Sequence, residues 1–282
     1  MLKINETGYV KSLEEIKKEV ARFNIIDDVF FQKVTEDLGA CEELLQILLG
    51  RTDISVVSSE NQKYLRNAGN KSVVLDLLCK DENGTLFNVE IQRSDNDDLQ
   101  KRMRYYISNI DTKSAEEGIT YSELPDIYSI MISEFDIFKK DKTVYHISRI
   151  LNESGEIQNN GIHELYINAK GKDASPISDL MKYFLDSNGY NEKFPKISKR
   201  VQYFKEEQEG IRKMGSYSDE LRAEGMAQGI AQGMAQGMAQ GMAQGMAQGM
   251  AQGLEQALKV LGVSKEEYER KLAEKKRAEG EA

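Results

Sequence analysis

The first fifty residues place apolar and polar side chains at helical spacing. In SLEEIKKEV, Glu15 follows Ser12 by three residues, which is the spacing of a capping box at the start of a helix. CEELLQILLG is leucine-rich and stops at Gly50, a residue type that is common just after a helix. We therefore predict helices over residues from about 10 to 50.

Beyond about residue 54 the pattern becomes that of strands. KSVVLDLLCK and LFNVEIQ are apolar, β-branched runs, and Asn83-Gly84 between them is a hairpin-turn signal. Later strands are predicted in PDIYSIMIS, TVYHISRIL and IHELYIN, with helices near 97–117, 176–187 and 196–213. We interpret His146 and His163, which fall in these strand segments, as ordinary sheet residues. The order predicts an α/β or α+β domain with one central sheet flanked by helices.

A repeat fills residues 226–253, where seven tetrads of Met/Ile-Ala-Gln-Gly follow one another. In a helix each tetrad advances by about 400°, so the methionine row drifts by about 40° per repeat and forms no fixed apolar stripe. Each interior glycine costs roughly 1 kcal/mol relative to alanine. A flexible tether and a self-associating helix both remain open. We expect three regions: a domain over 1–215, the repeat over 216–253, and a charged amphipathic helical tail over 254–282.

Composition narrows the class of protein. The chain has 282 residues, ordinary proportions of apolar and charged residues, and a net charge of −9. It shows neither a signal-peptide core nor an apolar run of membrane-spanning length, so we expect a cytoplasmic protein without membrane contact. Cys41 and Cys79 lie in apolar segments and suit buried thiols. The negative net charge argues weakly against non-specific nucleic-acid binding, because such proteins usually carry a basic surface. The local distribution of charge can still attract a polyanion.

Two carboxylates on the predicted hairpin are candidates for chemistry. Folding the chain about Asn83 brings Asp76 opposite the neighbourhood of Glu90, and Gln92 shares the Glu90 face of its strand. Carboxylates brought together in this way repel each other unless one is protonated or a cation lies between them. Oxygen donors of this kind suit Mg²⁺ or Mn²⁺. From spacing alone, an ordinary cross-strand pair or a solvated sheet end remains open.

The same residues resemble a known family. Asp76, Glu90 and Gln92 are similar to the motif of the PD-(D/E)XK nuclease superfamily, in the branch of nuclease-family transposases, or recombination-promoting nucleases. The matching segments run in the family's order: Asp28-Val29-Phe30-Phe31, EELLQILLG, Lys71 to Asp76, Val89-Glu90-Ile91-Gln92, Arg102 to Tyr106, and Gly118 to Ile130. The Gly-containing tetrads that begin near LRAEGMAQG also resemble family members.

The resemblance implies a restriction-endonuclease-like fold, with a mixed central sheet flanked by helices and a helical or flexible repeat tail. Asp76 and Glu90 would bind Mg²⁺ or Mn²⁺, and Gln92 would stand where the wider superfamily has a catalytic Lys. An additional acid is expected from the first core helix, with Glu43 preferred and Asp28 second. A surface or capping role is the alternative for both.

These inferences lead to a leading hypothesis and alternatives. The leading one is a divalent-metal-dependent DNA endonuclease linked to recombination or mobile elements, without an organic cofactor. DNA contacts are expected from Arg93, Arg102, Arg104 and Tyr105, although a solvated helix face and aromatic packing are the alternatives. The second is a catalytically weak or inactive DNA-binding or regulatory protein that keeps the fold. The third is an assembly module driven by the repeat. A homodimer is plausible, but the sequence shows no interface.

Overall fold

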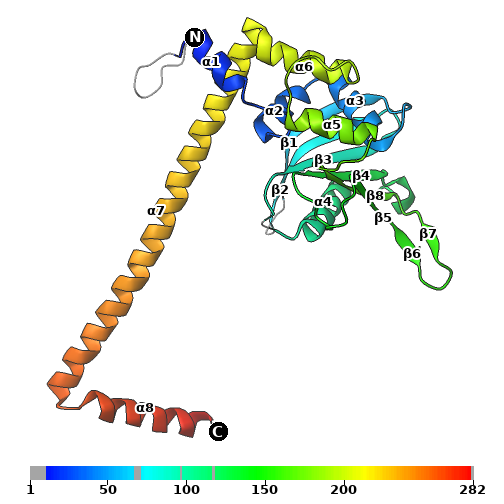
Figure 1. The fold of residues 1–282 in the computed structure, drawn as a ribbon. Coiled ribbons are helices and arrows are strands. Elements are labelled where there is room, and N and C mark those ends of the chain that lie inside the picture. Colours follow the sequence, from blue (N-terminus) through cyan, green and yellow to red (C-terminus); the bar gives the residue numbers. More distant parts are fainter. Residues whose placement is uncertain (1–10, 67–70, 96, 116–117, 281–282) are drawn as a thin grey trace. The chain divides into compact units, whose positions relative to one another are not determined.

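The computed structural model describes residues 11–66, 71–95, 97–115 and 118–280 (Figure 1). Contacts divide the chain into two units, Met1–Ser218 and Asp219–Ala282. The first unit contains the sheet and the candidate site. The second unit contains the repeat.

A six-stranded mixed sheet forms the centre of the first unit. Its strands lie in the order β1-β2-β3-β4-β8-β5. The outer pairs β1–β2, β2–β3 and β5–β8 are antiparallel, whereas β3–β4 and β4–β8 are parallel. The strands are β1 Val56–Leu65, β2 Val73–Asp81, β3 Leu86–Gln92, β4 Ile127–Ser133, β5 Val144–Ile147 and β8 Ile162–Asn168.

Helices cover both faces of this sheet (Figure 1). One face carries α1 Leu13–Val20, α2 Asp28–Val34, α3 Leu38–Leu49, α5 Pro176–Leu185 and α6 Pro195–Glu206. The other face is covered by α4 Leu99–Ser114, which connects towards β4 through the short 3₁₀ helix Tyr121–Glu123. The predicted central sheet with flanking helices is therefore confirmed.

The two core clusters follow these layers. Phe30, Phe31 and Phe87 are fully buried in the cluster beneath α2, α3, α5 and α6. Met103 of α4 and Tyr166 of β8 are buried in the cluster on the opposite face. Because β3 is covered on both sides, its residues from Phe87 to Gln92 are all buried. Any carboxylate on this strand is therefore removed from water.

The hairpin between β2 and β3 has the predicted register. Leu77 pairs with Val89 and Lys80 with Leu86, as folding about Asn83 requires. Asp81 N–H donates to Thr85 O at 3.1 Å, which closes a three-residue loop, and Gly84 adopts φ +86°. The Asp81 carboxylate accepts the N–H groups of Asn83 and Thr85 at 3.0 and 2.8 Å. The turn thus fixes which residues of the two strands face each other.

Several further sequence predictions are confirmed, and two strands were missed. Ser12 and Glu15 form the capping box of α1, and α3 ends at Gly50 with φ +61°. His146 and His163 lie on β5 and β8, and both cysteines are free and buried. One missed strand is β1, whose polar SSENQK segment hides its strand character, and the other is the short segment Glu156–Gln158. A separate two-stranded hairpin, β6 Arg149–Leu151 with β7 Glu156–Gln158, follows β5.

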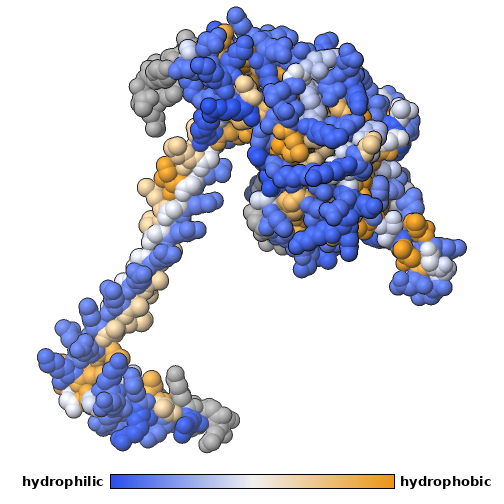
Figure 2. All heavy atoms as spheres, in the orientation of Figure 1, coloured by the Kyte–Doolittle hydropathy of each residue, from blue (hydrophilic) through white to orange (hydrophobic). Residues whose placement is uncertain are grey.

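The C-terminal region is helical. Helix α7 spans Gln208–Leu261 and includes the whole repeat, and α8 spans Lys265–Gly280. Repeat methionines such as Met234 and Met250 are 67% and 72% exposed. Figure 2 shows apolar and polar atoms side by side along this helix, as expected for a drifting methionine row. Alanine, methionine and glutamine favour helix strongly enough to offset the glycines. No described helix is both long and apolar enough to cross a membrane.

Replacing Gly233, Gly237, Gly241 and Gly245 by alanine tests the cost of the repeat glycines. No atom lies within 4 Å of the Cβ that each substitution would add. We expect slower backbone hydrogen exchange across 226–253, since each change favours helix by roughly 1 kcal/mol. Hydrogen-exchange mass spectrometry of the full chain measures this effect. Unchanged or faster exchange would show that the glycines serve close helix–helix approach instead.

Candidate active site

The candidate site lies where β2 and β3 separate. Backbone pairing of the two strands ends at Leu77 and Val89, one step before Asp76 and Glu90. From there the carboxylates bond to the opposite backbone. Asp76 N–H donates to Glu90 Oε1 at 3.3 Å, and Ile91 N–H donates to Asp76 Oδ2 at 2.9 Å. The two side chains therefore occupy the space that a continued ladder would fill.

The neighbouring strand β1 is irregular at the same level. Asn61 pairs with Leu77 and Lys63 with Leu75, so Gln62 lies opposite Asp76. Gln62 has φ +51°, an uncommon value for a residue with a side chain, and its amide donates to Asp76 Oδ1 at 3.3 Å. Sequence reasoning missed Gln62, since nothing in SSENQK distinguishes one polar residue from the next.

Strand β2 also changes face at Asp76. Leu77 and Cys79 pack into the cluster beneath α2 and α3, whereas Val73 and Leu75 pack into the cluster with α4. In a regular strand these alternate residues would share one face. The irregularity keeps leucines buried on both sides of Asp76 while the carboxylate stays at the strand junction.

Glu90 is the most buried group of the site. Its relative exposure is 0%, and Oε2 has no hydrogen-bond partner among the described residues. Burial raises the pKa of Glu90 well above its ordinary value, and the Asp76 charge raises it further, while Arg102 opposes both. Burial likewise raises the pKa of Asp76 to about 6, against the Ile91 hydrogen bond. The surroundings of the pair thus disfavour the charged form of both carboxyl groups.

Arg102, on α4, brings positive charge to this pair. Its Nη2 lies 3.9 Å from Glu90 Oε2, and its Nη1 donates to Gln92 Oε1 at 2.9 Å. Its Nε donates to the Tyr106 hydroxyl at 2.8 Å, and Gln92 Nε2 donates to Ser94 O at 2.6 Å. Both ends of the Gln92 amide are therefore engaged. Gln92 holds Arg102 in place beside Glu90.

The arrangement fits a divalent cation. Mg²⁺ keeps several waters and often takes only one or two protein carboxylates together with substrate phosphate. Glu90 Oε2, buried without a hydrogen-bond partner among the described residues, is an oxygen suited to such an ion. Within the described ranges no group of three or more His, Cys, Asp or Glu is placed to hold a metal. A site here would thus rest on Asp76 and Glu90.

The two acids expected from the first helices, Glu43 and Asp28, have different surroundings. The Glu43 carboxylate accepts the N–H groups of Lys196 and Ile197, at 3.2 and 2.8 Å, and so caps the start of α6. These contacts agree with the capping alternative for Glu43, and its role as the additional acid stays a prediction. Asp28, at the start of α2, is close enough for its charge to raise the pKa of Asp76. Burial raises the pKa of Asp28 itself, against the charge of Arg93.

The side chains expected to contact nucleic acid differ in whether they already have partners within the protein. Arg93 forms ion pairs with Asp27 and with Glu134, the latter at 2.6 Å. The Tyr105 hydroxyl donates to the carbonyl of Lys71, which ties α4 to the segment before β2. Arg104 is exposed on α4, and no ion pair of Arg104 occurs in the described part of the chain. Arg104 is therefore the more open of these groups.

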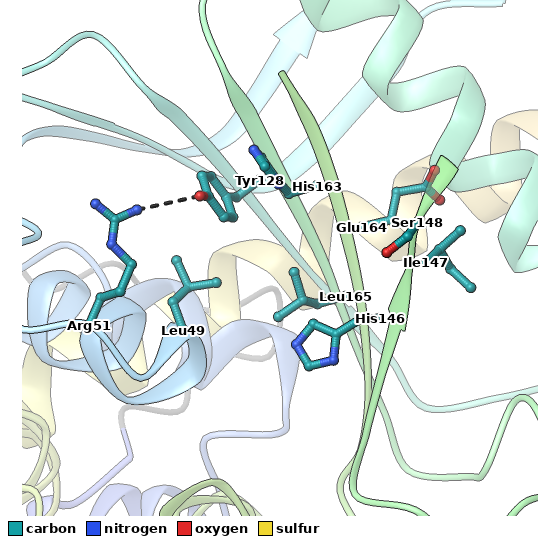
Figure 3. Close-up of a pocket in the computed structure, with 9 residues that line it drawn as sticks. All are labelled: Leu49, Arg51, Tyr128, His146, Ile147, Ser148, His163, Glu164 and Leu165. Atoms are coloured by element: carbon teal, nitrogen blue, oxygen red, sulfur yellow. Dashed lines mark hydrogen bonds between the residues drawn. The ribbon is translucent and has the colours of Figure 1, made fainter. Parts of the chain in front are cut away.

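A pocket lies away from Asp76 and Glu90. Its volume is about 220 Å³, and it is lined by Leu49, Arg51, Tyr128, His146, Ile147, Ser148, His163, Glu164 and Leu165 (Figure 3). Tyr128 and His163 stack with ring centroids 4.2 Å apart. Arg51 donates to the Tyr128 hydroxyl at 3.4 Å but is also paired with Asp53. The pocket contains neither Asp76 nor Glu90, so the candidate chemistry does not depend on it.

Comparison with protein families agrees with the geometry. The model of the PD-(D/E)XK nuclease family transposase matches residues 38–180. This chain belongs to that family. The matched segment runs from α3 into α5 and includes Asp76, Glu90, Gln92 and Arg102. No curated protein and no solved structure shows significant similarity to the chain.

Family membership supports several sequence predictions at different levels. The sheet order with flanking helices is consistent with the expected restriction-endonuclease-like fold. Membership also indicates a nuclease-type protein associated with mobile elements. The roles of individual residues go beyond this match. The repeat lies outside the matched segment.

Asp76→Asn should stabilise the cation-free protein at neutral pH. The folded carboxyl titrates near pH 6 rather than near 3.8, so wild-type stability falls as pH rises between these values. Asparagine lacks this titration and retains an acceptor for Ile91 N–H. We expect a gain of about 1–2 kcal/mol in free energy of unfolding at pH 7.5 that disappears near pH 4. Urea denaturation in EDTA measures the difference.

Asp179→Asn provides the matched control. Hydrogen bonds from Lys193 and Lys182 lower the pKa of Asp179, so its contribution to stability is present above the ordinary carboxyl pKa and lost as pH falls. Its substitution should destabilise the protein at neutral pH. A variant at Asp76 that behaved in the same way as this control would contradict the description of a strained carboxylate pair.

Proposed function

We propose that this protein is a divalent-metal-dependent DNA endonuclease associated with recombination or mobile elements. The observation that carries the proposal is the Asp76–Glu90 pair at the junction of β2 and β3, with one buried carboxylate oxygen lacking a hydrogen-bond partner among the described residues. Family membership adds the association with mobile elements.

Asp76 and Glu90 hold Mg²⁺ or Mn²⁺ in this proposal. When bound, such an ion stabilises charge that develops on the phosphodiester and activates a water for attack. Asp76 is held by Ile91 N–H and Gln62, and Glu90 Oε1 accepts Asp76 N–H. These hydrogen bonds fix three of the four carboxylate oxygens and leave Glu90 Oε2 for the cation. Asp28, whose charge raises the pKa of Asp76, would accept a proton from a water near the pair.

Arg102 supplies the positive charge that a Lys supplies in the wider superfamily. Gln92 cannot supply positive charge, but its Oε1 holds the Arg102 guanidinium beside Glu90. The Arg102 side chain is 29% exposed, so it can reach a phosphate oxygen while remaining fixed by Tyr106 and Gln92. A planar guanidinium binds phosphate oxygens through paired N–H groups. Arg102 thus stabilises charge on the phosphodiester, and Gln92 is its positioning residue.

Supercoiled-plasmid nicking tests the proposal. We expect cleavage in Mg²⁺ or Mn²⁺ that EDTA abolishes. Asp76→Asn and Glu90→Gln should each lower the rate by on the order of 100-fold or more, because each removes charge that holds the cation. Both changes preserve side-chain shape, so the variants should fold. Glu43→Gln is the matched control and should nick at the wild-type rate.

Other outcomes would assign a different function. Cleavage that survives both substitutions would place the active site elsewhere. Loss of cleavage in Glu43→Gln with the fold intact would restore the original expectation for Glu43. DNA binding without cleavage in any divalent metal would favour a DNA-binding or regulatory protein that keeps the fold. The engaged Gln92 amide at the Lys position is the observation that favours this second function.

Arg102→Gln and Arg104→Gln separate catalysis from binding. Removing Arg102 should lower the single-turnover rate at saturating DNA by about 100-fold, the usual cost of losing one transition-state donor. Arg104, two residues away and exposed, should affect mainly the DNA dissociation constant and its dependence on salt. Single-turnover kinetics and fluorescence anisotropy give the two quantities. Equal effects of both substitutions on affinity alone would exclude the catalytic role of Arg102.

A further inference from the structure

The pocket of Figure 3 and the carboxylate pair lie on opposite faces of the sheet. Tyr128, which lines the pocket, packs against the core cluster beneath α3. Val89 belongs to the same cluster, so the next residue of β3, Glu90, points to the other face. A group bound in this pocket is therefore separated by the sheet from Glu90.

Three aromatic rings cross the sheet in one row and end at the pocket. Phe87 of β3 pairs with Tyr128 of β4, and Tyr128 pairs with His163 of β8. The ring centroids are 5.3 Å apart in the first pair and 4.2 Å apart in the second, and both pairs are stacked. Exposure rises along the row, from a fully buried Phe87 to a His163 side chain that is 30% exposed. The row thus ends in a ring that solvent reaches.

Strand β5 adds no ring to this row. Ile147, the last residue of β5, pairs with Glu164, so Ser148 comes level with His163. Within the described residues no ring stacks on the β5 side of His163. The pocket of about 220 Å³ is lined here by His163 and Ser148, with Leu49 of α3 among the residues around it. A flat ring that entered the pocket would stack on the imidazole and continue the row.

Hydrogen-bonding groups around the pocket favour a ring with polar atoms on its edge. Asp53 accepts from Arg51 Nε and Nη2, at 3.0 and 2.7 Å, and so fixes the guanidinium. Its Nη1 faces the Tyr128 hydroxyl across a long 3.4 Å (Figure 3). The Ser148 hydroxyl and the His146 imidazole can each donate and accept. A nucleobase has donors and acceptors on its edge for such groups, whereas a hydrocarbon ring has none.

Size and charge favour the base of a nucleotide over its phosphate. The volume of about 220 Å³ is below the roughly 300–1,000 Å³ of pockets that enclose a whole drug-sized ligand, so it suits one ring system. Asp126 lies 3.9 Å from His163 Nε2, and Glu164 lines the pocket. A phosphate would meet these carboxylates, whereas a nucleobase is uncharged. Membership of a nuclease family makes nucleic acid a natural source of such a ring.

We propose that the pocket between His163 and Ser148 binds one unpaired nucleobase, stacked on the imidazole and contacted at its edge by Arg51. The base belongs to a free mononucleotide or to the unpaired end of a strand, since both present the same ring. A base inside a duplex is already stacked and paired, so it does not enter. The inference uses neither Asp76 nor Glu90, and a protein that fails to cleave DNA would still bind the base.

Quenching of 2-aminopurine fluorescence tests the proposal in EDTA, because the chain has no tryptophan to interfere. One probe is the 2-aminopurine mononucleotide, and the other is a duplex that carries 2-aminopurine as an unpaired end base. Saturable quenching of the first assigns a free nucleotide, and of the second a strand end. His163→Ala should raise the dissociation constant by about 10-fold, since stacking on an aromatic ring contributes on this order. His163→Phe keeps a ring and should restore binding.

Ser148→Phe tests the open place beside His163 directly. Its ring would fill that place and should abolish quenching. Because Ser148 is exposed, this variant should keep the fold, and it decides the question even where His163→Ala unfolds. Tyr121→Ala is the matched control, since Tyr121 is an aromatic residue that is 93% exposed and lies outside the pocket. It should bind both probes as the wild type does.

Several outcomes would overturn the proposal. Absence of saturable quenching with both probes is one, and quenching that persists in Ser148→Phe is another. Equal quenching of a fully paired 2-aminopurine duplex would show contact without a base pocket. Competition by phenylalanine amide as effective as competition by adenosine would assign the pocket to an aromatic side chain of a protein instead.

Discussion

Two carboxyl groups held together at the end of a strand pair are the constraint on which the rest of the site depends. The protein places Asp76 and Glu90 where β2 and β3 part, and uses their carboxylates in place of backbone ladder bonds. This removes both groups from water without fully neutralising them. Three features surround the buried pair: the Gln62 amide, the Arg102 guanidinium and the change of face along β2. A cation placed between the two carboxylates would relieve their mutual repulsion.

The hairpin shows how far sequence alone can reach. Local signals sufficed where the structure is local: Asn83-Gly84 fixed the register, and Ser12, Glu15 and Gly50 marked helix ends. That register placed Asp76 opposite the neighbourhood of Glu90, and the alternation of side chains placed Gln92 on the same face as Glu90. Each of these features depends on residues only a few positions apart in the chain.

The remaining features depend on contacts between distant segments. In the sequence, Glu43 is one of several acidic residues on predicted helices. Only the packing of α6 against α3 shows that Glu43 caps the first N–H groups of α6. Arg102 is one of several basic residues on α4, and only the packing of that helix brings it to Glu90. Strand β1 is polar because its outer edge faces solvent, so its composition resembles a loop. The tail glycines left a flexible tether and a helix both open in the sequence, and the structure shows a helix across the repeat.

The long-range hydrogen bonds of the N-terminal segment have a consequence for when the candidate site assembles during synthesis. Ile26 N–H donates to Phe184 O, and Ile25 N–H donates to Ser187 Oγ, so the segment that leads into Asp28 and α2 is anchored by residues made about 160 positions later. The parallel pairing of β3 with β4 and β8 likewise awaits residue 168. Non-local pairing of this kind folds slowly. The acids around Asp76 therefore assemble only when nearly the whole domain has left the ribosome, and a truncated chain lacks the completed cluster.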